Sequence, residues 1–255
     1  DVCSSDLGPT VVVSSACSSS AKVFASARRM LASGLIDAAV VGGVDSLCLT
    51  TLYGVASLEL TSPEPCRPGD AARKGLSIGE AAAFALLEPG DATNAAVVLS
   101  GWGEASDAHH MSAPHPEGRG SRAAMQGALA RAGLAPGDID YINLHGTATP
   151  ANDLAEGLAV SGVFGTALGA GVPCSSTKGI TGHTLGAAGA LEAVVCALAL
   201  EHGLLPPSVG TRTPDPAIPV DLIMLPRTAS LRHVLSNSFG FGGSNASLLL
   251  SRRGA

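Results

Sequence analysis

The order of an apolar strand, a helix and a second strand near the start of the chain limits its fold more than any other feature. Residues 10–16 are β-branched and uncharged, as in a short buried strand. From Ser18 to Ser33 apolar residues recur at three- and four-residue spacing, which predicts a helix, and Gly34 is placed to end it. Residues 37–43 indicate another buried strand. This order predicts a parallel unit, and therefore a layered α/β fold.

The rest of the chain repeats this rhythm without a strict sequence repeat. We interpret 61–79 as a loop and 90–94 as a linker between two α/β halves. Residues 233–251 predict two strands joined by a glycine-rich turn. Further strands are predicted at 80–88, 95–106, 139–146 and 172–176, and further helices at 121–134, from Pro150 to about Val160, and at 182–200.

Composition excludes several classes of protein. The chain has 255 residues, of which 46% are hydrophobic and 14% charged, so it can bury a core and is not disordered. A net charge of −6 without a basic cluster argues against a nucleic-acid-binding protein.

The apolar stretch 179–200 resembles a membrane span, but Glu192 lies inside it and His183 near its start. A carboxylate is costly in lipid, so we expect a buried helix and no membrane. Residues 1–7 do not resemble a signal peptide. The 6 cysteines form no CxxC pair, which favours reduced thiols and a cytoplasmic location.

Cys17 lies where the first apolar run ends and the helical pattern begins. Unpaired N–H groups and the helix dipole at such a position favour a thiolate, so we expect a lowered thiol pKa. Free cysteine is also among the most buried residue types. Local sequence alone therefore leaves a nucleophile and a buried filler as equal alternatives.

Two histidines favour the nucleophile. His145 follows a predicted strand, and His183 begins the long apolar helix, with Lys178 shortly before it. Strand ends and helix starts are where α/β proteins place their sites. Buried carboxylates need partners, and Lys178 is a candidate partner for the three that lie in apolar stretches: Asp153, Glu156 and Glu192.

The run "NSFGFGGSN" (237–245) has glycines that permit a close approach to a ligand, and its backbone N–H groups can bind an oxyanion. A plain hairpin turn is the alternative, but it does not explain two of the chain's 5 phenylalanines. The histidine-rich run 109–115 lacks a helical i,i+4 pair, so we predict no metal site there.

Taken together and in this order, "SSACSSS", "HGTATPAND", "SSTKGITGHTLGAAGALE" and "NSFGFGGSNAS" resemble the β-ketoacyl-acyl carrier protein synthases of the thiolase-like fold, in the Cys-His-His group. The resemblance runs from about Gly8 to the C-terminus, and residues 48–88 look most like synthases of bacterial aryl-polyene pathways. It implies layers in the order α-β-α-β-α. Residues 8–93 would be the end of the N-terminal half, and residues 94–255 the complete C-terminal half.

The resemblance implies a decarboxylating Claisen condensation with malonyl-acyl carrier protein, in fatty acid, polyketide or aryl polyene biosynthesis. Cys17 would carry the acyl group, and His145 and His183 would stabilise the enolate. The backbone N–H groups of Cys17 and Phe241 would form the oxyanion hole. The implied substrate contacts are Thr147, Thr149, Phe239 and Phe241, and the implied supporting network is Lys178, Asp153, Glu156 and Glu192.

The resemblance also implies an acyl carrier protein as partner, with substrates on its phosphopantetheine and no other cofactor or metal. The second subunit would be an identical chain or a chain-length-factor-like protein. In the family the nucleophile lies well inside the chain, whereas here it is residue 17. We therefore expect a truncated chain, with residues 1–7 a non-native junction.

Three alternatives remain. The chain could be a catalytically incompetent fragment or a non-catalytic partner subunit, although Cys17 and both histidines argue against a subunit without a nucleophile. A degradative thiolase would need a second cysteine, which "SNSFGFGG" lacks. A Cys-His-Asn synthase would have asparagine near the position of His183.

Overall fold

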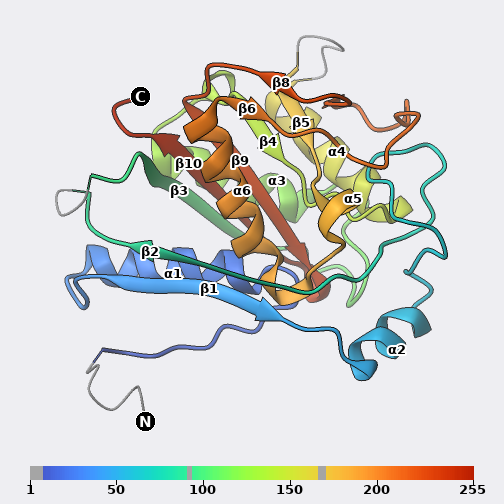
Figure 1. Cartoon of the computed structure of the whole chain (residues 1–255), viewed down its shortest axis with the longest axis horizontal. Coiled ribbons are helices and arrows are strands. Elements are labelled where there is room, and N and C mark those ends of the chain that lie inside the picture. Colours follow the sequence, from blue (N-terminus) through green and yellow to red (C-terminus); the bar gives the residue numbers. More distant parts are fainter. Residues whose placement is uncertain (1–7, 91–93, 166–170) are drawn as a thin grey trace.

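A computed structural model describes residues 8–90, 94–165 and 171–255, and it arranges them in four layers (Figure 1). The layers are a two-stranded ribbon, a pair of helices, a six-stranded sheet and a second pair of helices. The predicted α/β class is confirmed. Among the described residues no helix covers the outer face of the ribbon, so the outermost helical layer of the expected five is not seen there.

The six-stranded sheet has the order β3-β10-β9-β4-β5-β7. Strand β10 is antiparallel to both neighbours, whereas β9, β4, β5 and β7 run parallel to one another. The strands are β3 (Val97–Ser106), β4 (Tyr141–Asn143), β5 (Pro173–Ser175), β7 (Asp221–Leu222), β9 (His233–Gly240) and β10 (Ser244–Arg252).

The smaller sheets are antiparallel pairs. The ribbon pairs β1 (Ala39–Asp45) with β2 (Ala81–Leu87), and a short pair joins β6 (Leu204–Leu205) to β8 (Arg227–Thr228). The helices are α1 (Ser19–Ala32), α2 (Leu49–Ser57), α3 (Arg119–Ala132), α4 (Pro150–Phe164), α5 (Lys178–Thr181) and α6 (Ala188–His202).

Alternating side chains on the central strands build two cores, one on each face of the six-stranded sheet. Leu248 and Leu250 of β10 face α1, α6 and the ribbon, whereas Leu249 between them faces α3 and α4. Val234 and Leu235 of β9 divide in the same way. Because successive side chains of a strand point to opposite faces, one apolar run supplies both cores.

Most of the predicted elements are confirmed. Helix α1 ends where Gly34 adopts φ +69°. The Leu35 N–H donates to the Met30 carbonyl and the Gly34 N–H to the Leu31 carbonyl, as in a Schellman motif. All described cysteines, from Cys17 onward, are free.

The prediction of a strand at residues 10–16 is wrong. Among the described residues this segment pairs with no strand, so its backbone hydrogen bonds are not completed in a sheet, and Val12 is 89% exposed. The predicted parallel strand–helix–strand unit is therefore absent, and β1 pairs antiparallel with β2 instead. The short helix α2 was not predicted.

The long helix expected at 182–200 is also corrected. Gly182 and Leu185 adopt positive φ values of +67° and +49°, which an α-helix cannot accommodate. The chain therefore forms three separate segments here: the short helix α5, a 3-10 turn at Leu185–Ala187, and α6. His183 thus lies in an irregular segment before α6, not at its start.

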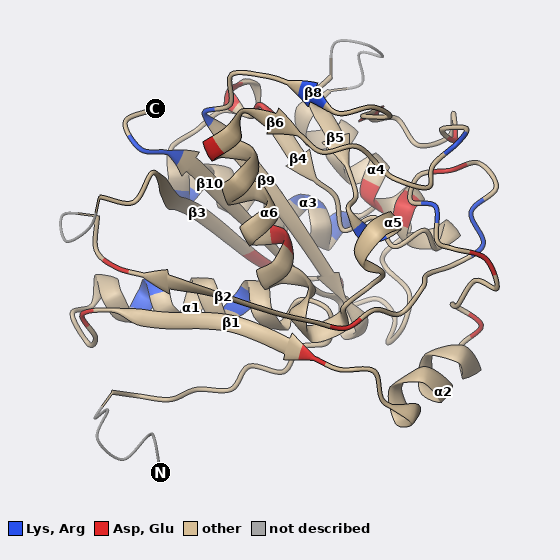
Figure 2. Cartoon of the chain, viewed as in Figure 1, with Lys and Arg blue, Asp and Glu red and all other residues tan. Residues whose placement is uncertain are grey.

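Helix α6 belongs to the core. The stretch Leu185–His202 is long and apolar enough to cross a membrane by length and composition alone, and 50% of it is buried inside the protein. It packs between the ribbon and the six-stranded sheet (Figure 1). Along the described part of the chain, Lys and Arg are interspersed with Asp and Glu (Figure 2).

Helix α3 packs against β3 at a distance that only glycine permits. A Cβ on Gly103 would lie 1.7 Å from the carbonyl oxygen of Ala124. Backbone cannot give way as a flexible side chain can, so the contact depends on glycine.

We therefore expect Gly103→Ala to lower the free energy of unfolding by about 3 kcal/mol, since overpacking forces the backbone apart. Urea unfolding followed by circular dichroism measures this. Gly54→Ala is the matched control, because Gly54 lies in α2 with open space around its Cβ position. Equal midpoints for the two variants would contradict the packing argument.

Candidate active site

Cys17 lies in a strained turn immediately before α1. Ala16 holds φ +52°, in the left-handed region that alanine rarely adopts. A Cβ on Gly240, at the end of β9, would lie 2.8 Å from the Ser15 carbonyl oxygen and 3.1 Å from the Cys17 nitrogen. The glycine therefore lets the end of β9 approach the turn closely, which brings the glycine-rich run beside the thiol.

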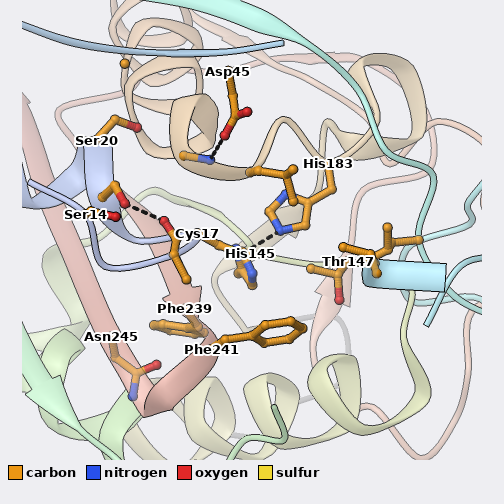
Figure 3. A pocket seen from close by; sticks show the side chains of 18 of the residues that line it. Ser14, Cys17, Ser20, Asp45, His145, Thr147, His183, Phe239, Phe241 and Asn245 are labelled. Atoms are coloured by element: carbon orange, nitrogen blue, oxygen red, sulfur yellow. Dashed lines mark hydrogen bonds between the residues drawn. The ribbon is translucent and has the colours of Figure 1, made fainter. Parts of the chain in front are cut away.

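The loop that precedes β2 binds both backbone groups of His183. Its N–H donates to the Ser77 carbonyl at 2.7 Å, and its carbonyl accepts the Gly79 N–H at 3.0 Å. Nε2 of His183 lies 3.0 Å from Sγ of Cys17. The rings of His183 and His145 are edge to face, with centroids 5.1 Å apart. Cys17, His145 and His183, which are distant in sequence, thus converge on one cavity (Figure 3).

Lys178 orients His145. Its Nζ forms a buried ion pair with Glu192 and lies 3.4 Å from Nδ1 of His145. An ammonium group only donates hydrogen bonds, so Nδ1 accepts and the ring proton resides on Nε2. His145 is therefore a hydrogen-bond donor through Nε2.

Burial decides the protonation of the three converging groups. It raises the pKa of the Cys17 thiol to about 11, although Lys178 and the backbone N–H groups of Phe241 and Cys17 oppose the shift. The expected lowering of this pKa is therefore wrong, because desolvation outweighs the helix start. Burial, aided by Lys178, holds the pKa values of His145 and His183 well below their usual range. Both rings are neutral at neutral pH.

The three predicted carboxylates have three different partners, and only Glu192 pairs with Lys178. Glu156 accepts the backbone N–H groups of His145 and Gly146, each at 2.8 Å, and the side-chain amide of Asn237 at 3.1 Å. Burial nevertheless raises the pKa of Glu156 to about 7.

Asp153 binds the loop that carries the threonines. It accepts the Ala148 N–H at 3.1 Å and the Gly69 N–H at 2.8 Å, and its cationic neighbour is Arg73 at 3.9 Å, not Lys178. Its pKa is raised by burial, which these contacts oppose.

The glycine-rich run provides backbone donors and a hydrophobic wall. The N–H groups of Cys17 and Phe241 both point at Sγ of Cys17. Phe239 is buried, with its ring 5.9 Å from that of His145, whereas Phe241 is 36% exposed. Both phenylalanines line the same cavity as Cys17 (Figure 3).

The cavity has a volume of about 770 Å³ and is largely apolar. Its walls include Val23 of α1, Val44 of β1 and Phe84 of β2. Thr147 and Thr149 also line it, with their hydroxyl oxygens 2.9 Å apart. An apolar chain with a polar end fits these linings.

Cys17, His145 and His183 are the one cluster of three metal-capable side chains among residues 8–90, 94–165 and 171–255. Their ligand atoms lie within 4.8 Å of one another. The ammonium group of Lys178 beside His145 opposes a cation there. The run 109–115 forms no such cluster; the rings of His109 and His115 are in contact at a tilt of 58°, with centroids 5.0 Å apart.

Sequence reasoning missed Ser77, Gly79 and Asn237, which hold His183 and Glu156. Ser77 and Gly79 belong to the predicted loop 61–79 and stand in no pattern that indicates a site, whereas Asn237 opens the run 237–245, which was singled out for its glycines and phenylalanines. It also missed Asp45, although the carboxylate at the end of an apolar strand was a signal. Residues 1–7, the expected junction, lie outside the described residues.

Both parts of the chain match known families. The N-terminal domain of beta-ketoacyl synthases matches residues 7–92, and the C-terminal domain matches residues 96–212. The 3-oxoacyl-[acyl-carrier-protein] synthase 2 of Rhizobium meliloti is 41% identical over 96% of this chain and 61% of its own length. The chain spans between 56% and 63% of the length of the curated relatives it matches.

Two solved structures are similar throughout. The ketosynthase ApeO of Xenorhabdus doucetiae, in complex with its chain length factor ApeC, is 47% identical, with a TM-score of 0.90 over 96% of this chain and 60% of that one. AntDE:AntF, a type II PKS acyl-carrier protein in complex with its ketosynthase, is 25% identical, with a TM-score of 0.92 over 96% and 63%. Because both domain models fall in order on one chain that has the fold of solved ketosynthases, this chain belongs to the beta-ketoacyl synthase family.

Proposed function

We propose that the protein condenses an acyl group held on Cys17 with malonyl-acyl carrier protein, with loss of carbon dioxide. The observation that supports this most is the convergence of the Cys17 thiol and two neutral histidines in one buried site. A thiol can carry an acyl group as a thioester, and neutral imidazole N–H groups can stabilise an enolate oxygen without a metal.

Acyl transfer comes first. Sγ of Cys17 attacks the carrier thioester, its proton passes to Nε2 of His183, and the carrier thiol leaves with that proton. His183 is placed for this role by its 3.0 Å contact. The backbone N–H groups of Cys17 and Phe241 bind the oxygen of the tetrahedral intermediate.

Condensation follows. Malonyl-acyl carrier protein loses carbon dioxide, and the electron pair of the broken bond moves into an enolate. Its oxygen accepts hydrogen bonds from Nε2–H of His145 and from Nε2–H of His183, whose single ring proton shifts from Nδ1 to Nε2 through solvent once Cys17 is acylated. The enolate carbon attacks the acyl thioester on Cys17. The carbon–sulfur bond breaks, releasing the 3-oxoacyl-carrier product and the Cys17 thiolate, which regains a proton. Lys178 and Glu192 support His145, and Thr147 and Thr149 hold the pantetheine arm.

Substrates and partners follow from the relatives. We propose an acyl carrier protein as donor, because a similar solved ketosynthase is bound to one. We propose a second ketosynthase-like subunit, identical or a chain length factor, because ApeO is paired with ApeC. Fatty acid, polyketide and aryl polyene pathways all fit. The division at about residue 93, the truncation and the cytoplasmic location stay predictions.

A labelling experiment separates an active enzyme from an incompetent fragment. The purified chain is mixed with a radiolabelled acyl-carrier protein, and label on Cys17 is measured by peptide mapping. Transfer supports the proposal. A folded protein that takes no label, while ApeO assayed beside it does, would show that this chain alone is not an enzyme.

Substitution of His145 and of His183 is expected to have different effects on the reactivity of Cys17. His145→Ala should leave alkylation of Cys17 by iodoacetamide unchanged, because of the two imidazoles only that of His183 forms a hydrogen bond with Sγ, whereas His183→Ala should slow it. Each should reduce malonyl decarboxylation by about 10²-fold or more, because an oxyanion donor is lost. Release of labelled carbon dioxide measures this, with His109→Ala as control. Normal decarboxylation in both variants would exclude the mechanism.

The raised thiol pKa predicts the pH dependence of Cys17 reactivity. With a pKa of about 11 the thiol is protonated at neutral pH, so the thiolate fraction grows with pH. Alkylation by iodoacetamide should rise about tenfold per pH unit from about pH 7 to pH 9 without a plateau. A plateau below about pH 8 would show that the thiolate is stabilised instead.

A further inference from the structure

Helix α6 has no residue of its own to cap its N-terminus. The run Leu185–Ala190 is "LGAAGA", and the N-cap Ala187 has no side-chain acceptor. The first N–H groups of a helix have no partner within the helix, and Ser, Thr, Asp or Asn normally accept one of them. The acceptors here must come from elsewhere in the fold.

Two side chains from the region of Cys17 bind this segment. Oδ2 of Asp45, the last residue of β1, accepts the Gly186 N–H at 2.9 Å, in the 3-10 turn that leads into α6 (Figure 3). Oγ of Ser20, in the first turn of α1, accepts the Ala190 N–H at 2.9 Å, in the first turn of α6. These bonds join positions 141 and 170 residues apart in sequence.

The capped segment is the one that carries His183. Leu185, next to Gly186, is held at φ +49°, so the turn between His183 and α6 is strained and needs support from its surroundings. Ser20 is only three residues from Cys17, and Asp45 lines the same cavity. The loop residues Ser77 and Gly79 hold His183 from the other side.

From these contacts we infer that Asp45 and Ser20 are positioning residues: Asp45 holds the turn before α6, Ser20 holds the first turn of α6, and together they set the place of His183 against Cys17. The inference rests on the proposed condensation for its consequence in turnover. Neither side chain contacts Sγ or an imidazole ring, so neither is a catalytic residue. The carboxylate of Asp45 additionally complements the positive end of the helix dipole.

The test compares four proteins: wild type, Asp45→Ala, Asp45→Asn and the control Asp37→Ala. Asp37 is exposed on the turn that leads into the same strand. The first readout is the pH profile of Cys17 alkylation by iodoacetamide. The second is malonyl decarboxylation, measured beside acylation of Cys17.

We expect Asp45→Ala to slow alkylation in the same direction as His183→Ala and to reduce decarboxylation by about tenfold or more, since small misplacements of a reacting group are costly. Asp45→Asn keeps an oxygen that accepts the Gly186 N–H, so it should restore most of both. Asp37→Ala should behave as wild type. Ser20→Ala should act as Asp45→Ala does, with Ser26→Ala of the same helix as its control.

A structural role alone would lower the melting temperature of Asp45→Ala and leave its alkylation profile and its ratio of decarboxylation to acylation at the wild-type values. That result would overturn the inference. If the wild type itself does not decarboxylate malonyl-acyl carrier protein, the proposed function fails. The alkylation profile of the variants then still decides whether Asp45 positions His183.

Discussion

The site depends on the close packing of α1 against α6. A Cβ on Gly189 would lie 2.5 Å from the backbone nitrogen of Ala21, so the two helices meet almost backbone to backbone. A Cβ on Gly43 would meet Ser20 at 2.6 Å, which brings β1 equally close. Because both helices begin at this crossing, Cys17 before α1 and His183 before α6 are brought into contact. Small residues at the crossing are thus a condition of the chemistry.

Burial of this helix crossing determines which groups of the site are charged and which are neutral. Beside the three converging groups lies one buried ion pair, Lys178 with Glu192, whereas the thiol of Cys17 and the imidazoles of His145 and His183 are neutral. Desolvation keeps the thiol protonated and the imidazoles uncharged, while Lys178 determines which nitrogen of His145 carries the proton. A site of this kind suits chemistry in which charge develops on a thioester oxygen and is met by fixed donors.

Prediction from sequence succeeded where local pattern decides structure. The period of apolar residues located α1, and Gly34 located its end. It failed at residues 10–16, because a β-branched run is a strand only if a neighbour completes its hydrogen bonds. It failed at His183, because the positive φ of Leu185 is imposed by packing and has no signature in a leucine. The thiol pKa of Cys17 was misjudged because the depth of burial is not local information.

Residue types and their order along the chain indicated the family and the candidate reactive groups, since four motifs in order carry the cysteine, the histidines and the lysine. The partners of these groups depend on the folded arrangement: His183 rather than His145 against Cys17, Arg73 rather than Lys178 beside Asp153, and Asp45 at the turn before α6. The difference is one of distance along the chain. Residue types and periodicities are written along the chain, whereas hydrogen bonds, desolvation and caps depend on which distant segments the packing of small residues brings together.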